Sequence, residues 1–125
     1  MPRVRAVGNR WHAGVMETTV RKHTGPEGER FEIVADGEVA GFAMFVDVEG
    51  RRVFFHTEIG PEFGGKGLAT VLVRHALEKT SQEGLRIVAV CPFVKKYVNT
   101  HTEEWASHVD AATPPLLAAI PRSHG

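Results

Sequence analysis

Hydrophobic and polar residues alternate with a period of two through the first half of the chain. Phe31–Ala35 is a short β-prone run, and the Asp36-Gly37 pair after it is a typical hairpin turn. A second predicted strand, Glu38–Val48, carries apolar residues on both faces: Phe42, Met44, Val46 and Val48 on one, and Val39, Ala43 and Phe45 on the other. This pattern predicts a central strand that is covered on both sides. A third strand, Arg52–Ile59, follows a turn at Glu49-Gly50.

The period then changes to that of a helix. From Gly67 to about Gln82 the apolar residues recur on one helical face, and Gly84 stands where a helix commonly ends. Arg86–Val90 is a short buried strand, and Pro92 suits the first turn of a second helix. The order β-β-β-α-β-α predicts an α/β fold. Its mixed sheet would hold an antiparallel meander and then a parallel strand pair joined by a helix, with flanking helices.

Composition and charge narrow the class of protein. The chain has 125 residues, 42% of them hydrophobic and 24% charged, as expected of one globular domain. Lys and Arg number 15, as do Asp and Glu, so no basic excess indicates nucleic-acid binding. No apolar run approaches the roughly 18 residues of a membrane span. Cys91 is the single cysteine, which excludes an intrachain disulfide and favours the cytoplasm.

Three segments are expected from these patterns. Residues 1–17 show no sustained period and are interpreted as a flexible N-terminal arm. Residues 18–109 form the domain, and residues 110–125, with three prolines around a few apolar side chains, form an irregular C-terminal tail.

A glycine-rich turn joins the third strand to the first helix, with the sequence Gly60-Pro61-Glu62-Phe63-Gly64-Gly65-Lys66-Gly67-Leu68. Glycines allow close backbone approach, and a helix start favours an anion, so a phosphate is one natural ligand. A tight turn without a ligand is the plainer interpretation. The stretch also nearly fits a P-loop, but Gly67 replaces the hydroxyl residue that such a loop needs for Mg²⁺.

The same turn resembles the coenzyme A pyrophosphate loop of the GNAT superfamily of N-acetyltransferases, Q/R-x-x-G-x-G/A. Glu62 replaces the leading Gln or Arg, and Gly64 stands where Arg is common. With His56-Thr57-Glu58-Ile59 before it and Cys91-Pro92-Phe93-Val94, Tyr97 and His101 after it, residues 20–109 resemble small single-domain GNAT-like proteins. The resemblance implies acetyl-CoA as cosubstrate and no metal, with cofactor contacts from Ile59, Gly64, Gly65, Lys66, Gly67, Leu68, Ala69 and Cys91.

The resemblance also implies three candidate catalytic residues. His56 would be the general base, since an imidazole titrates near neutral pH; otherwise it is a surface strand residue. His56 and Cys91 would reach the same crevice, where Cys91 would carry the acetyl group if His56 or the following helix activates the thiol; otherwise it is a small core residue. Tyr97 would protonate the departing thiolate, or else lie at the edge of the core. Direct transfer is favoured, because it is the commoner superfamily route.

The sequence therefore predicts an acetyl-CoA-dependent N-acetyltransferase acting on an amine. Polyamines, protein lysines, protein N-termini and antibiotic amines all remain open as acceptors. A coenzyme A-binding or interaction module with little catalysis is the alternative, because a small chain leaves few residues for an acceptor pocket. The histidines show no zinc-site spacing, and no nucleic-acid or membrane partner is expected.

Overall fold

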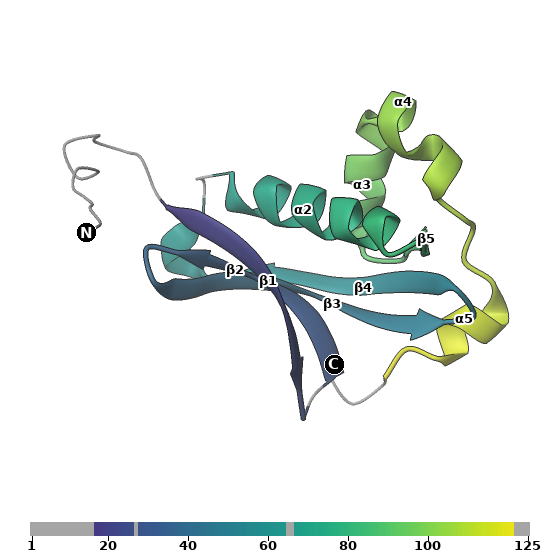
Figure 1. Cartoon of the computed structure of the whole chain (residues 1–125), viewed down its shortest axis with the longest axis horizontal. Helices are drawn as coiled ribbons and strands as arrows, with labels where there is room; N and C mark the ends of the chain where they lie inside the picture. Colours follow the sequence, from purple (N-terminus) through teal and green to yellow (C-terminus); the bar gives the residue numbers. More distant parts are fainter. Residues whose placement is uncertain (1–16, 27, 65–66, 122–125) are drawn as a thin grey trace.

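The structure is one mixed sheet with helices packed mainly against one face. The computed structural model describes residues 17–26, 28–64 and 67–121. Five strands run in the spatial order β1-β2-β3-β4-β5 (Figure 1), with bounds Thr18–Gly25, Gly28–Ala35, Glu38–Val48, Arg51–Ile59 and Arg86–Ala89. The first four strands are antiparallel, and β4 and β5 are parallel. This arrangement confirms the predicted fold class.

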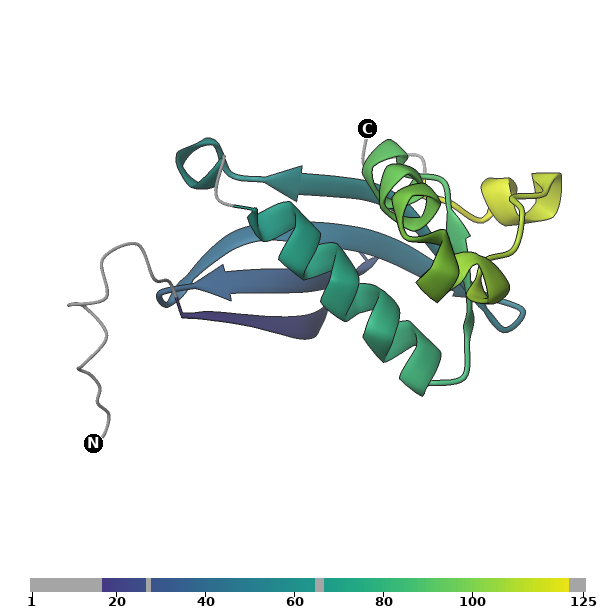
Figure 2. The same cartoon turned by 90° about the horizontal axis from the view of Figure 1, so that it is seen from above.

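The helices follow the predicted order. A 3₁₀ turn, η1 (Pro61–Phe63), links β4 to the long helix α2 (Leu68–Gln82), which connects β4 to β5. After β5 come α3 (Pro92–Thr100), α4 (Thr102–Trp105), η2 (Ala106–His108) and α5 (Pro114–Ala118). Figure 2 shows α2 lying diagonally across the sheet, with α3 and α4 beside its C-terminal half. The N-terminal arm falls almost wholly outside the described residues.

One strand was not predicted. The sequence indicated three strands before the first helix, but β1 precedes them and pairs with β2 along its whole length. The strand β1 lies at the sheet edge, and most of its side chains are exposed. Because an edge strand can carry polar residues on both sides, Arg21, Lys22 and His23 hide the period of two on which the prediction depends.

The main core lies between the sheet and α2. Leu72 and Leu77 of α2 are fully buried, and they belong to the same cluster as Phe31, Phe45 and Phe54 of the sheet. These three rings form a triangular cluster in which each ring contacts the other two, with centroids 5.2 to 6.3 Å apart. The apolar stripe that predicted the helix is therefore the face that packs on the sheet.

The opposite side of the sheet, here called the open face, is only partly covered. Leu116 of α5 is buried there against Val53 and Val88. Asp110 secures the approach to α5, because its carboxylate accepts hydrogen bonds from both Arg51 and Arg86. The C-terminal segment thus passes from the helix side to the open face (Figure 1). The predicted boundary at residue 110 stays a prediction.

Two register shifts decide which side chains reach each face. Between β2 and β3, Ile33 pairs with Gly41 but Val34 pairs with Val39, so Ala40 is an extra residue. Val39 therefore shares the open face with Val34 and is 44% exposed, which corrects its predicted place beside Ala43. Between β3 and β4, Met44 pairs with His56 and Phe45 with Phe54, which leaves Phe55 as a bulge.

Candidate acyl-transfer site

Strands β4 and β5 separate halfway along β4. Their pairing runs only from Arg51 and Arg86 to Phe54 and Ala89, although β4 continues to Ile59. The Phe54 carbonyl accepts hydrogen bonds from the backbone N–H groups of both Val90 and Cys91, at 3.0 and 2.9 Å. The chain then turns into α3. We call this point, where β4 and the β5–α3 junction part directly after the Phe55 bulge, the strand split.

Cys91 lies at the strand split, on the side of the sheet that faces α2. It is 4% exposed, belongs to the main core and precedes the first residue of α3. Its thiol donates a hydrogen bond to the Thr57 hydroxyl, with 3.2 Å between Sγ and Oγ1. The sequence reasoning did not single out Thr57. Its place opposite the buried Ala43, one residue after His56, follows from the register of β4.

His56 projects from the open face instead. Its partner on β3 is Met44, and strand alternation turns it away from Thr57. The imidazole Nε2 lies 3.1 Å from Glu58 Oε1, and its ring centroid is 5.9 Å from that of Phe42. The His56 side chain is 39% exposed. The structure therefore does not bring His56 and Cys91 into one crevice, as the sequence reasoning expected, but places them on opposite faces of the sheet at the strand split.

The glycine-rich turn follows the free end of β4. After Ile59 and η1, Gly64 has an extended backbone with φ of −65°, and Gly67 has φ of +73° directly before α2. A Cβ at Gly67 would meet no atom of the described residues within 4 Å, so they leave the backbone at this helix start open. Leu68 is buried and Ala69 is half-buried. The predicted cofactor residues Gly65 and Lys66 lie outside the described residues.

The start of α2 has the properties of an anion site. Its 15 residues align their peptide dipoles, and the first turn carries no acidic side chain. The first N–H groups of a helix have no partner within that helix, so they are available to a ligand. The part of β4 that is not paired with β5 runs from the strand split toward this helix start. This arrangement fits an elongated ligand that carries a phosphate at one end.

Tyr97 is buried in α3 and faces its neighbouring helices. The ring is 7% exposed and stacks on His101, with 4.2 Å between centroids. Burial raises the pKa of the Tyr97 hydroxyl, and the negative charge of Glu104 adds to this, while Arg74 of α2 acts in the opposite direction. The phenol is therefore protonated at neutral pH. Among the described residues, no hydrogen bond joins it to the Thr57–Cys91 pair.

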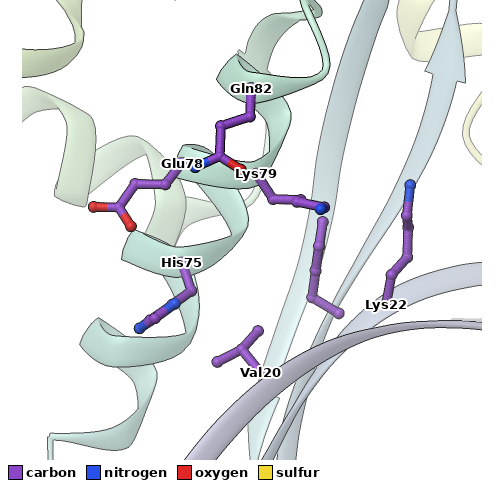
Figure 3. Close-up of a pocket in the computed structure, with 7 residues that line it drawn as sticks. Val20, Lys22, His75, Glu78, Lys79 and Gln82 are labelled. Atoms are coloured by element: carbon purple, nitrogen blue, oxygen red, sulfur yellow. The ribbon is translucent and has the colours of Figure 1, made fainter.

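A pocket of about 180 Å³ lies away from these residues, between β1 and α2 (Figure 3). Figure 3 shows the side chain of Lys79 extending from α2 toward Lys22 of β1, whereas that of Glu78 points away from β1. Lys22 is already bonded to both carboxylate oxygens of Glu83. The pocket contains none of the predicted site residues.

In residues 17–26, 28–64 and 67–121, no three His, Cys, Asp or Glu side chains gather closely enough to hold a metal ion. Within the same ranges, no helix combines the length and the apolar composition that crossing a membrane requires.

Comparison with known proteins agrees with this geometry. The family model described as GCN5-related N-acetyl-transferase matches residues 30–108, which include the glycine-rich turn and the strand split. The chain therefore belongs to the GCN5-related N-acetyltransferase family. A GCN5-like protein of Staphylococcus aureus, solved by NMR, has the same fold, with a TM-score of 0.54 and 20% identity over 75% of this chain and 91% of that one. The search of curated proteins finds no match.

Proposed function

We propose that the protein is an acetyl-CoA-dependent N-acetyltransferase that transfers the acetyl group to an amine. The strand split carries this proposal, because it opens the edge of β4 between a helix start suited to phosphate and the part-buried thiol–hydroxyl pair of Cys91 and Thr57. Backbone groups of a β-strand that lose their strand partner are available to a ligand. The pantetheine arm would lie along β4, with its pyrophosphate at Gly64–Leu68.

The residues on the two faces of the sheet at the strand split support separate roles, one toward the acyl donor and the other toward the amine acceptor. Thr57 and Cys91 lie on the face that carries α2, and so on the side of the acyl donor. His56 and Glu58 lie on the open face, where an incoming amine would meet them. The amine nitrogen bonds to the acetyl carbon as the carbon–sulfur bond breaks. His56 takes the proton that the nitrogen loses, and Glu58 holds the imidazole in place.

Tyr97 and Cys91 complete the proposal. Tyr97 is the candidate donor of the proton that the departing thiolate takes up, because burial keeps its hydroxyl protonated at neutral pH. Cys91 is assigned to the acyl site without becoming acetylated. Its 4% exposure and its bond to Thr57 support direct transfer, since an attacking thiol has to reach the acetyl carbon as a thiolate. A single buried cysteine also supports a cytoplasmic location.

The test is turnover on a panel of amines, with release of coenzyme A as the signal. The panel should include a polyamine, a lysine-containing peptide, a peptide with a free N-terminus and an aminoglycoside. We expect amine-dependent release with at least one class, and its loss in His56→Ala. Acetyl-CoA binding without release on any amine would favour a coenzyme A-binding module instead.

A further inference from the structure

Thr57 places a partly exposed hydroxyl at the strand split, beside the Cys91 thiol. A hydroxyl offers one O–H donor and two acceptor sites. The Cys91 thiol occupies one acceptor site of Thr57, at 3.2 Å. Thr57 is half-buried, whereas the thiol beside it is buried, so the hydroxyl lies between the core and the opening of the strand split. Its hydrogen can rotate toward a ligand that enters the split while the oxygen keeps its contact with the thiol.

We propose that Thr57 is the residue that binds the acyl carbonyl, by donating its O–H to the carbonyl oxygen of the thioester. This inference rests on the proposed function. The hydrogen bond with the Cys91 thiol orients the Thr57 side chain. Because Thr57 directly follows His56 in β4, the donor and the base occupy neighbouring positions on opposite faces of the sheet. Donor and base therefore act on the reacting carbon from its two sides.

The chemistry gives this donor a role in both binding and rate. As the amine attacks, negative charge grows on the acyl oxygen, and a hydrogen bond already aimed at that oxygen becomes stronger. Coenzyme A without an acyl group has no such oxygen. Thr57 should therefore distinguish acetyl-CoA from coenzyme A, which a residue that only packs between β4 and α3 would not do.

The experiment is calorimetric titration with acetyl-CoA and, separately, with coenzyme A. The wild type is compared with Thr57→Val, which keeps the shape of the side chain and removes the hydroxyl, and with Thr57→Ser, which keeps the hydroxyl. We expect Thr57→Val to weaken acetyl-CoA binding about three- to tenfold and to leave coenzyme A binding within about twofold. Thr57→Ser should retain the wild-type preference. Thr19→Val, on the exposed edge strand β1, is the matched control and should change neither affinity.

Two outcomes would overturn the inference. An equal loss of affinity for acetyl-CoA and coenzyme A in Thr57→Val would show that the hydroxyl only maintains the packing of the site. Unchanged binding of both ligands would show that the acyl oxygen does not contact Thr57. If the wild type binds neither ligand, the proposed function fails first and the role of Thr57 fails with it. An unfolding curve for each variant separates loss of the site from loss of the fold.

Discussion

His56 and Cys91 lie on opposite faces of the sheet at the strand split, because Thr57, and not His56, is the β4 residue that contacts the Cys91 thiol. On the open face, the imidazole Nε2 of His56 lies 3.1 Å from Glu58 Oε1. The two residues are therefore not a thiol–imidazole pair. In the proposed function, their separation divides the site into a donor side and an acceptor side, and this division can be tested by substitution.

Replacing His56 should affect catalysis without affecting the cofactor. We expect His56→Ala to lower kcat at least about 100-fold, as loss of a general base does, with acetyl-CoA affinity unchanged within about twofold. Steady-state kinetics and calorimetry measure the two effects. Glu58→Gln should give a smaller fall in kcat, because the imidazole remains and only its partner is weakened. A fall in acetyl-CoA affinity equal to the fall in kcat would argue against the division of the site.

Cys91 should be dispensable for covalent chemistry. If transfer is direct, Cys91→Ala should keep kcat within about tenfold of the wild type. If the thiol were the nucleophile, the same variant would lose nearly all activity. Intact-mass measurement after incubation with acetyl-CoA should show no added acetyl group on the wild type. The variant Cys91→Ser keeps a hydrogen-bond donor for Thr57 and should stay closer to the wild type than Cys91→Ala. An acetyl adduct that is lost in both variants would contradict this prediction.

The fold was largely predictable because its main signals are local. The predicted helix from Gly67 to about Gln82 matches Leu68–Gln82, since the apolar stripe contains Leu72 and Leu77 of the core. Strand β5 and the helix start at Pro92 were also found from local patterns. The edge strand β1 was missed because little of it is buried, and burial is what produces a recognisable pattern.

The site was less predictable because it depends on register. His56 and Thr57 are adjacent, and alternation alone shows that they point to opposite faces, but not which of them faces Cys91. In an unbroken strand from Val53 onward, His56 would lie on the face of Cys91. The bulge at Phe55 places Thr57 on that face instead. No local composition marks this bulge. The contact between Thr57 and Cys91 thus follows from pairing between strands that are distant in the sequence.

Arg52 should be a main determinant of stability. Its side chain is 1% exposed, bonds to Asp47 and Glu83, and lies 4.3 Å from the ring centroid of Phe45. We expect Arg52→Ala to lower the free energy of unfolding by about 2–4 kcal/mol, because packing and two ion pairs are lost together. Lys22→Ala is the matched control, since Lys22 binds the same Glu83 at the surface and should contribute about 0–1 kcal/mol. Denaturant unfolding measures both; equal effects would refute the special role of Arg52.

Acid should destabilise the fold through these ion pairs. The hydrogen bond from Arg52 holds the pKa of Glu83 below its ordinary value of 4.5, and Lys22 acts in the same direction. A carboxyl whose pKa is lowered in the folded state stabilises the fold above its ordinary pKa. That contribution is lost as the pH falls through the folded-state pKa. Unfolding curves from about pH 7 to about pH 3 should show this fall, and Glu83→Gln should reduce it. An equally steep fall in Glu83→Gln would show that other groups are responsible.

The proposed phosphate site in the glycine-rich turn is best tested at Gly64. Its φ of −65° is open to any residue, and among the described residues a Cβ there would meet only the Pro61 carbonyl oxygen, at 3.6 Å. Substitution at Gly67 would instead strain the backbone, because its φ is +73°. Gly64→Asp therefore adds a negative charge beside the proposed phosphate site without distorting the turn, and Gly64→Ala adds the same Cβ without the charge.

The most direct measurement is calorimetric titration of the wild type, Gly64→Ala and Gly64→Asp with acetyl-CoA. We predict saturable binding to the wild type and to Gly64→Ala, with affinities within about twofold, and binding at least about tenfold weaker to Gly64→Asp, because its carboxylate repels the pyrophosphate. Absence of binding to the folded wild type, or equal binding to all three proteins, would contradict the proposal that this turn and the strand split form an acetyl-CoA site.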